Sequence, residues 1–241
     1  MRLDQYLIDR QFFKTRTKAQ EAIKAGAVQV NGKIVLKANT AIEDGALIEI
    51  IKEVHPYVSR GGLKLEAAIQ AFNLSFSDRI VLDIGASTGG FTDCALKHGA
   101  KRVYACDVGS NQLDDCLRNN EAVVVMEQTN ILDVESLPDA IDYIVMDVSF
   151  VSIEKILPAI KRFLNDANAW ICLIKPQFEV GKMYLKNGIV KNQKLREKVL
   201  QNVEQTLKNN GMRLVKCIPS PILGGSGNQE FLAYIQKDVE C

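Results

Sequence analysis

Residues 80–93 read IVLDIGASTGGFTD, and this stretch decides the fold of most of the chain. Its first part, Ile80–Ile84, is an apolar run that contains one acid, Asp83, and predicts a buried strand. A turn with three glycines follows, and glycines at such a turn let the backbone approach a ligand closely. A helical pattern over Phe91–Lys97 comes next. The stretch therefore predicts a strand, a ligand-binding loop and a helix of an α/β domain.

Strand and helix patterns alternate on both sides of this stretch. Six further strands are predicted, at Arg102–Cys106, Ala122–Met126, Tyr143–Asp147, Trp170–Lys175, Met212–Ile218 and Glu230–Gln236. Helices besides Phe91–Lys97 are predicted at Leu63–Phe72, Ile153–Phe163 and Gln193–Lys208. This alternation indicates a Rossmann-like fold with a mostly parallel seven-stranded sheet that is covered on both faces. The last two strands have no room for a helix between them, so we expect an antiparallel pair at one edge.

Three classes of ligand use a glycine-rich loop of this kind. A Walker A loop needs Lys and then Ser or Thr after its last glycine, whereas Phe91 follows Gly90 here. A dinucleotide fingerprint needs G-x-G-x-x-G, and the residues Ser87 and Thr88 break that spacing. The remaining class is S-adenosylmethionine, which carries no phosphate. An acid at the end of the next strand, Asp107, can accept hydrogen bonds from its ribose hydroxyls.

The residues expected to bind this cofactor lie in the loop and at the ends of the next two strands. They are Asp83, Gly85, Ala86, Ser87, Thr88, Gly89, Gly90, Phe91, Asp107, Val108 and Asn130.

The residues expected to do the chemistry follow from the same topology. The carboxyl ends of parallel strands form the ligand crevice of an open α/β sheet. Asp147 ends the fourth predicted strand and Lys175 the fifth, so we expect these two side chains to face each other beside the loop. Lys64, on the helix before the first strand, and Glu230, at the start of the last strand, could complete the group. The pattern alone does not place these two.

The acceptor of the methyl group leaves its own signature. The segment after Asp147 reads Val-Ser-Phe and lacks the proline pair typical of enzymes that methylate base amino groups. No cysteine lies nearby to attack carbon 5 of a pyrimidine. Two lysines with two carboxylates suit a ribose 2′-hydroxyl, which is a poor nucleophile and must lose its proton. A lysine takes that proton only in its neutral form, which burial and a second ammonium favour.

The first fifty residues predict a small α+β domain of their own. Helical spacing predicts two helices, and Thr17 is expected to cap the second. The runs Val28–Val30 and Lys33–Val35 flank Asn31-Gly32, a strong signal for a β-hairpin. Residues 51–58 have the composition of a connector, and residues 59–241 form the α/β domain.

Positive charge is concentrated in this small domain. Residues 1–40 carry a net charge of +5, whereas the other 201 residues sum to −4. A basic domain on a mildly acidic body indicates an anionic partner. The order of elements in RLDQYLIDRQFFKTRTKAQEAIKAGAVQVNGKIV closely resembles the S4 RNA-binding domain. The residues expected to contact RNA are Arg2, Arg10, Lys14, Thr15, Arg16, Lys18, Lys24, Asn31 and Lys33.

Motifs along the whole chain resemble one family. SRGGLKL, LDIGASTGGFTD, DVSF, KPQFE and GNQEFLAYI are similar to the TlyA family of FtsJ-related rRNA 2′-O-methyltransferases, whose members are often labelled hemolysins. The resemblance implies S-adenosylmethionine as the cofactor and ribosomal RNA or ribosomal subunits as the partner. It implies transfer to cytidine 2′-hydroxyls of 16S or 23S rRNA, or of both. It also carries a Lys-Asp-Lys-Glu tetrad onto Lys64, Asp147, Lys175 and Glu230.

Several other functions are disfavoured by the sequence. No apolar run approaches the ~18 residues of a membrane-spanning helix, and the N-terminus has no signal-peptide pattern, so we expect a cytoplasmic protein with no membrane partner. The six cysteines and two histidines lack metal-ligand spacing, so no metal is expected. Two alternatives stay open. One is an RNA-binding ribosome-assembly factor whose methyltransferase fold is not catalytic, although the intact tetrad argues against it. The other is a membrane-active hemolysin.

Overall fold

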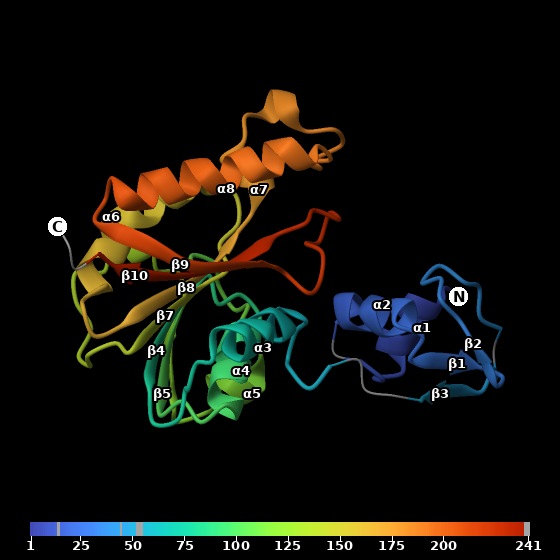
Figure 1. The fold of residues 1–241 in the computed structure, drawn as a ribbon. Coiled ribbons are helices and arrows are strands. Elements are labelled where there is room, and N and C mark those ends of the chain that lie inside the picture. The colour runs from blue at the N-terminus through green and yellow to red at the C-terminus, as the bar shows by residue number, and fades with distance from the viewer. Residues whose placement is uncertain (14, 44, 52–54, 239–241) are drawn as a thin grey trace. The chain divides into compact units, whose positions relative to one another are not determined.

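The chain divides into two units, Met1–Ser59 and Arg60–Cys241. The structure is a computed structural model that describes residues 1–13, 15–43, 45–51 and 55–238 (Figure 1). The candidate RNA contact Lys14 and part of the expected connector, residues 52–54, lie outside the described residues.

The first unit packs two helices against a small sheet. Its elements are α1 (Leu3–Asp9), α2 (Arg16–Lys24), β1 (Val28–Val30), β2 (Lys33–Ile34) and β3 (Ile48–Ile50). The three strands are antiparallel in the order β2-β1-β3, and Leu3, Leu7 and Ile23 fill the core beneath them.

Two local predictions for this unit have different outcomes. The predicted hairpin is confirmed, because both Asn31 and Gly32 have the positive φ that its tight turn requires, 51° and 75°. The predicted helix cap is wrong. Thr15, not Thr17, has an extended backbone and accepts a hydrogen bond from Lys18 N at 3.3 Å, so α2 begins at Arg16.

The second unit contains a seven-stranded sheet in the order β6-β5-β4-β7-β8-β10-β9. Its strands are β4 (Ile80–Ile84), β5 (Arg102–Cys106), β6 (Val123–Met126), β7 (Tyr143–Met146), β8 (Ala169–Ile174), β9 (Met212–Pro219) and β10 (Phe231–Lys237). The pairs among β4 to β8 are parallel, and β10 is antiparallel to both β8 and β9. The expected parallel sheet with an antiparallel edge pair is confirmed.

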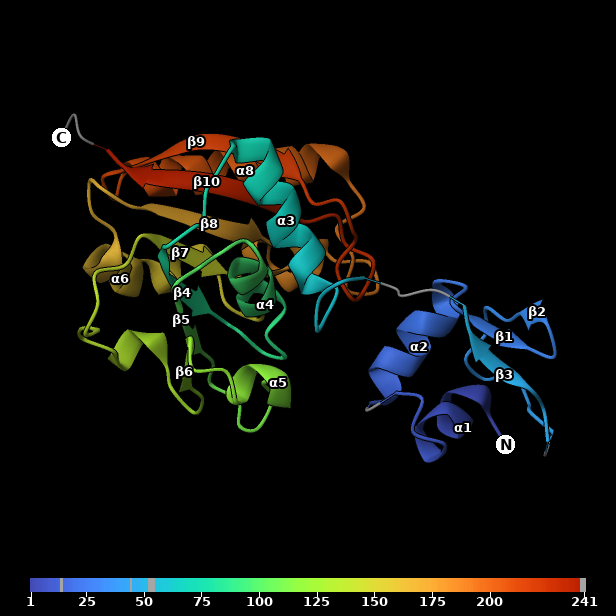
Figure 2. The ribbon, with the colours of Figure 1, turned by 90° about the horizontal axis from the view of Figure 1, so that it is seen from below.

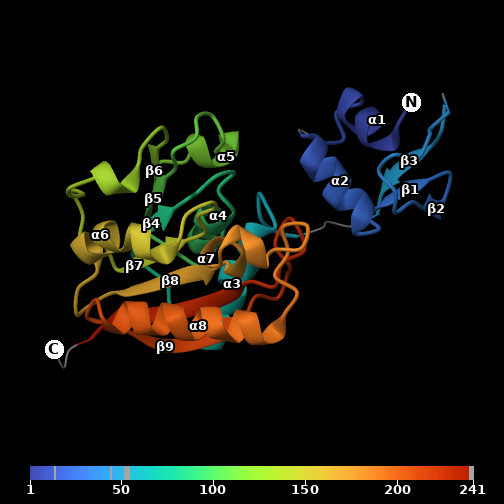
Figure 3. The ribbon, with the colours of Figure 1, turned by 90° about the horizontal axis from the view of Figure 1, so that it is seen from above.

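Helices cover both faces of this sheet. They are α3 (Gly61–Phe72), α4 (Gly90–Lys97), α5 (Asp115–Arg118), α6 (Ile153–Phe163), α7 (Pro176–Glu179) and α8 (Gln193–Lys208), with 3-10 turns η1 (Ile131–Asp133) and η2 (Lys182–Tyr184). Seen from below, α3, α4 and α5 lie in front of the sheet (Figure 2), and seen from above, α6 and α8 do so (Figure 3). The short elements α5, α7, η1 and η2 were not predicted, because three or four residues carry no periodicity.

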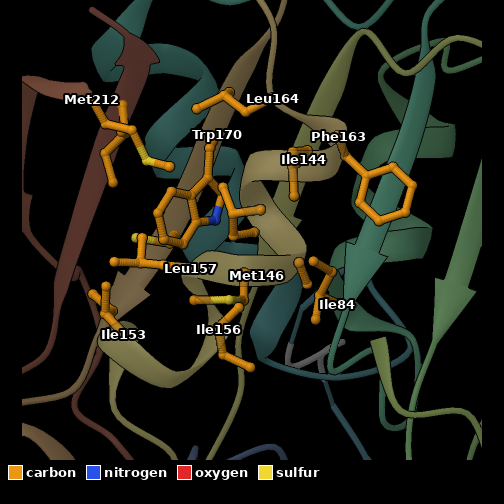
Figure 4. Close-up of a cluster of buried hydrophobic side chains, with 14 of the residues drawn as sticks. Ile84, Ile144, Met146, Ile153, Ile156, Leu157, Phe163, Leu164, Trp170 and Met212 are labelled. Atoms are coloured by element: carbon orange, nitrogen blue, oxygen red, sulfur yellow. The ribbon is translucent and has the colours of Figure 1, made fainter. Parts of the chain in front are cut away.

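The main hydrophobic core fixes the strands that position the site. Trp170 of β8 is fully buried among side chains of β7, α6 and β9, including Met146, Leu157 and Met212 (Figure 4). Burial of such large apolar surfaces is the main favourable term in folding. The register that results pairs Met146 with Cys172 across β7 and β8. The carboxyl ends of these two strands are therefore held side by side.

Candidate functional site

Strand register brings three of the four tetrad residues to one edge of the sheet. Asp147 follows the last residue of β7, and Lys175 follows the last residue of β8. Glu230 directly precedes Phe231 of β10, which pairs with Ile174. The fourth residue, Lys64, comes from α3, which packs against β10.

The four side chains form one ionic cluster. Lys64 Nζ lies 2.9 Å from Glu230 Oε2 and 3.2 Å from Asp147 Oδ2. Lys175 Nζ lies 2.6 Å from Asp147 Oδ1. The expectation that Asp147 and Lys175 face each other is confirmed. Lys64 and Glu230, which the sequence pattern left unplaced, lie in the same cluster.

The cluster is buried and electrically balanced. Only 7% of Lys64, 8% of Lys175 and 3% of Glu230 is exposed. Burial acts to raise the pKa of the Asp147 carboxyl, but the ammonium groups of Lys64 and Lys175 outweigh it, so this pKa lies below its usual value. Asp147 is therefore an anion that holds two lysines in fixed positions.

Neighbouring groups that the sequence did not single out complete the cluster. Ser149 Oγ accepts a hydrogen bond from Lys175 Nζ at 2.8 Å. Gln177 Nε2 donates to Glu230 Oε1 at 3.0 Å. Gly224 lies so close to the Glu230 carboxylate that a Cβ atom there would collide with it. Ser149 belongs to the DVSF motif and Gln177 to the KPQFE motif, so the sequence contained a signal for both residues. Only the structure shows which atoms they contact.

A cavity of about 500 Å³ opens beside the cluster. It is bounded by the glycine-rich loop, the ends of β5 and β7, and η1. Five of the residues expected to bind a cofactor line it, together with Asp147 and Ser149; they are Gly85, Ser87, Asp107, Val108 and Asn130.

The backbone of the loop is shaped for close approach. Gly85 has φ +81°, and a Cβ atom there would lie 3.0 Å from the carbonyl oxygen of Asp147. Asp107 holds the loop from the other side, because its carboxylate accepts hydrogen bonds from Ser87 N at 2.8 Å and Gly109 N at 2.7 Å. These contacts fix the cavity wall and place a carboxylate on it.

The other six expected cofactor residues do not line this cavity within the described part of the chain. Gly90 and Phe91 are buried in α4, and Asp83 is fully buried beneath the loop. Ala86, Thr88 and Gly89 shape the turn itself, since Gly89 (φ +94°) packs against Leu117 so tightly that no Cβ would fit. Their expected role in contacting the cofactor stays a prediction.

Asp83 is a buried carboxyl with an unusual protonation state. Thr92 Oγ1 donates a hydrogen bond to its Oδ2 at 2.6 Å. Burial raises the pKa of Asp83 to about 7, although the Thr92 hydrogen bond acts in the opposite direction. Near neutral pH the carboxyl therefore carries a proton much of the time.

Sequence reasoning missed the acid that organises the next loop. Glu127 accepts hydrogen bonds from the backbone N–H groups of Asn111, Gln112 and Leu113 and from Arg118. These donors, Leu113 N–H first among them, lower the pKa of Glu127 to about 2. An acid directly after a predicted strand was the available signal.

An exposed aromatic ring stands at the rim of the cavity. Phe150 has a positive φ of 66°, uncommon for a bulky residue, and 88% of it is exposed. Its ring lies 5.0 Å from that of Phe178. A side chain so exposed contributes little to folding, and its strained backbone aims it outward beside the tetrad.

In the first unit, a buried carboxylate holds two of the candidate RNA contacts. Asp4 has no exposed surface, and it accepts hydrogen bonds from Arg2, from Arg16 Nε at 2.9 Å and from Gln20 Nε2 at 2.8 Å. The Arg2 hydrogen bonds are the largest cause that lowers the pKa of Asp4. About half of each arginine side chain stays exposed, 51% in both cases.

The other candidate RNA contacts are mostly at the surface. Arg10, Lys24, Asn31 and Lys33 are exposed, and Lys18 is half-buried. Some have structural contacts as well: Thr15 caps α2, Asn31 Oδ1 accepts a hydrogen bond from Leu47 N, and the Arg10 guanidinium lies 5.5 Å from the centre of the Tyr6 ring. Their role toward RNA stays a prediction.

No cluster of three or more His, Cys, Asp and Glu side chains in the described ranges is arranged to hold a metal ion. Nor does any helix in those ranges have the length and apolar character needed to cross a bilayer.

The sheet order, the glycine-rich loop and the cavity at the carboxyl edge define the larger unit as a Rossmann-like methyltransferase domain. The FtsJ-like methyltransferase family model matches residues 57–237, and the S4 domain model matches residues 1–48. The chain belongs to the FtsJ-like methyltransferase family and carries an S4 domain at its N-terminal end. The resemblance seen in the sequence is confirmed.

Similar proteins span nearly the whole chain. Hemolysin A of Brachyspira hyodysenteriae is 48% identical over 97% of this chain and 99% of its own length. The 16S/23S rRNA (cytidine-2′-O)-methyltransferase TlyA of Mycobacterium tuberculosis is 37% identical over 99% of this chain and 91% of its own. A solved structure from Streptococcus thermophilus, described as a candidate hemolysin, has a TM-score of 0.79 at 43% identity and covers 99% of this chain and 89% of its own.

Asp83→Asn tests the protonation of the buried carboxyl. An acid whose pKa is raised on folding loses protons first in the unfolded state, so its contribution to stability falls as pH rises from about 4 to about 7. Across this window we expect the free energy of unfolding of the wild type to fall by on the order of 3 kcal/mol relative to that of the variant. Urea unfolding followed by the fluorescence of the single tryptophan, Trp170, measures it. A difference independent of pH would show that Asp83 is ionised in the folded state.

Asp4→Asn tests the buried anchor of the first unit. Loss of the carboxylate removes charge-assisted hydrogen bonds from Arg2 and Arg16, which we expect to lower the stability of this unit by about 2 kcal/mol. Hydrogen exchange of the full chain should show less protection in α1 and α2 and unchanged protection in β4 and β8. Asp9→Asn, at an exposed position on the same helix, is the control. Equal protection in both variants would contradict the anchoring role.

Proposed function

We propose that this protein transfers a methyl group from S-adenosylmethionine to a ribose 2′-hydroxyl of ribosomal RNA. The observation that carries the proposal is the Asp147 carboxylate held between two buried ammonium groups at the mouth of the cavity. The name of the Mycobacterium tuberculosis relative supports cytidine as the nucleotide and 16S or 23S rRNA, or both, as the substrate. Such a substrate implies action in the cytoplasm.

The chain's residues fit S-adenosylmethionine. Gly85 lines the cavity and lets the loop lie directly against the backbone of Asp147, and Asp107 offers a carboxylate for ribose hydroxyls. Asn130 and Val108 line the same wall, and we expect them to contact the adenine and ribose of the cofactor. When bound, the cofactor supplies a methyl group on a positively charged sulfur.

The tetrad then serves the acceptor. Asp147 and Glu230 together fix Lys64, and Asp147 and Ser149 fix Lys175. The transfer requires Lys175 in its neutral form, whose Nζ would then accept the proton of the 2′-hydroxyl as the hydroxyl oxygen takes the methyl group and the bond between methyl and sulfur breaks. The positions of all four groups are set before the substrate arrives, which lowers the cost of orienting the reactants.

The S4 domain supplies the RNA contacts in this proposal. Arg2 and Arg16, anchored by Asp4, present guanidinium groups that suit phosphate oxygens. Lys18 and Lys24 lie on the same helix, α2, and Arg10, Lys33 and Asn31 extend the contacts.

The direct experiment uses tritiated S-adenosylmethionine with isolated small and large ribosomal subunits that lack the modification. We expect label on one or both rRNAs, at a nucleotide whose ribose proves to be 2′-O-methylated. Cofactor binding without label on either subunit would contradict the enzyme and favour the assembly-factor alternative.

Lys175→Gln tests the proton acceptor. Loss of a general base lowers rates by roughly 10³-fold, so we expect near-complete loss of methyl transfer with cofactor binding retained. Single-turnover transfer and calorimetric titration with S-adenosylmethionine measure the two properties. Lys161→Gln, at an exposed position in the last turn of α6, is the matched control. Transfer at the wild-type rate by the Lys175 variant would overturn the assigned role.

Ser149→Ala tests a positioning residue. Without the Ser149 hydroxyl, Lys175 loses one of its two fixed partners, so we expect kcat to fall about tenfold with the KM for cofactor unchanged. Ser152→Ala, at the start of α6, where the side chain makes no capping hydrogen bond, is the control. Equal kcat values for the two variants would show that Ser149 does not position the lysine.

A further inference from the structure

A second concentration of positive charge lies in the methyltransferase domain. Residues 181–198, here called the basic segment, contain six Lys or Arg and one acid, a net charge of +5. The first unit nets +2 and the whole chain +1, so the remaining residues of the second unit sum to −6. The basic segment is thus a positive feature on an otherwise acidic domain.

The basic segment has a fixed shape. It runs from η2 through a tight turn, closed by the bridge Lys186–Ile189, into the first half of α8. The buried side chain of Asn228 ties it down, because Nδ2 donates to Gly188 O and Oδ1 accepts from Val190 N, both at 2.9 Å. Arg196 Nη1 also donates to Val190 O at 2.9 Å, so its guanidinium belongs to this scaffold.

Four lysines of the segment are exposed, namely Lys186, Lys191, Lys194 and Lys198. In the part of the chain that the structure describes, none of the four forms an ion pair, whereas Arg79, Arg102 and Arg118 on the same domain are paired with carboxylates. A solvated helix face would be expected to alternate its charges.

The placement of two of these lysines works against the helix. The N-terminal end of a helix favours acids, yet the first turn of α8 has none and carries Lys194. Lys198 lies beyond that turn, but it is four residues from Lys194, and like charges at this spacing also destabilise a helix. The stability of the helix therefore does not explain the lysines at these positions. The binding of an anion would explain them.

The segment also lies beside the tetrad in the chain. It follows α7, which begins directly after Lys175, and its anchor Asn228 is two residues before Glu230. Figure 1 shows it as the orange loop and helix end that project from the sheet beyond α7. Two large side chains are exposed within it, Met183 at 85% and Tyr184 at 56%.

We propose that the basic segment binds the phosphate backbone of the substrate RNA beside the nucleotide that receives the methyl group. This inference rests on the proposed function and adds a second RNA contact, separate from the S4 domain. Lysines that neutralise phosphates release counterions, which makes such binding strong and dependent on salt. Tyr184 among the lysines favours RNA over an acidic protein, because an exposed aromatic ring can stack on a base.

The test replaces three lysines together, Lys186→Gln, Lys191→Gln and Lys194→Gln. The changes are at exposed positions and remove a cation from a helix N-terminus, so folding is not threatened. We expect the Kd for isolated ribosomal subunits to rise on the order of tenfold, and the slope of log K against log salt to fall by about two. The KM for subunits should rise with kcat unchanged, because these lysines do not touch the reacting atoms.

A matched control carries the same loss of charge elsewhere. Lys101→Gln, Lys161→Gln and Lys208→Gln are at exposed positions directly before β5, at the end of α6 and at the end of α8. These positions lie toward the amino ends of the parallel strands, opposite the tetrad. We expect this variant to bind and methylate subunits as the wild type does.

The outcomes separate the inference from the proposed function. A basic-segment variant with the affinity and salt slope of the control overturns the inference, even if the wild type methylates rRNA normally. Loss of affinity for intact subunits but not for protein-free rRNA also overturns it, because the partner would then be a ribosomal protein. Absence of methyl transfer by the wild type contradicts the proposed function, whereas the binding slopes still decide whether the lysines contact phosphates.

Discussion

The ionic cluster around Asp147 is the constraint on which the rest of the site depends. Lys64, Lys175 and Glu230 are buried and Asp147 is largely so, each lies within ion-pair distance of at least one of the others, and each charge would be costly to bury alone. The arrangement is tolerable only because two ammonium groups balance two carboxylates. Because the four come from α3 and from the ends of β7, β8 and β10, these three strands must be in register before the cluster can form.

The cluster and the cofactor cavity are parts of one structure. Gly85 packs against the carbonyl of Asp147, so the ligand loop after β4 and the end of β7 share a close backbone contact. Asp83, beneath that loop, has its pKa raised to about 7 by burial, so near neutral pH it adds no further carboxylate charge to the site much of the time. A displacement of the loop would therefore shift the tetrad, and a shift of the tetrad would displace the loop.

The sequence predicts those parts of the site that follow from periodicity and topology. Asp147 and Lys175 end neighbouring parallel strands, so their meeting could be deduced from pattern. Lys64 could not be placed in this way, because α3 reaches the cluster by packing against β10, and Glu230 could not, because the pattern does not show which strand β10 pairs with. The cap at Thr17 was wrong because Thr15 offers the same chemistry two residues earlier. Contacts such as that of Ser149 depend on side-chain geometry that no spacing rule contains.

Charge is used in three physically different ways in this chain, which the net value of +1 conceals. In the tetrad, opposite charges neutralise one another and orient groups for chemistry. In the S4 domain, buried Asp4 uses its charge to fix two half-exposed arginines. In the basic segment, four exposed lysines form no ion pair within the described residues, and Lys194 lies in the first turn of α8, where the helix dipole disfavours a cation. Only the third arrangement is unfavourable for the isolated protein, and an unfavourable local charge is best explained by the anion that relieves it.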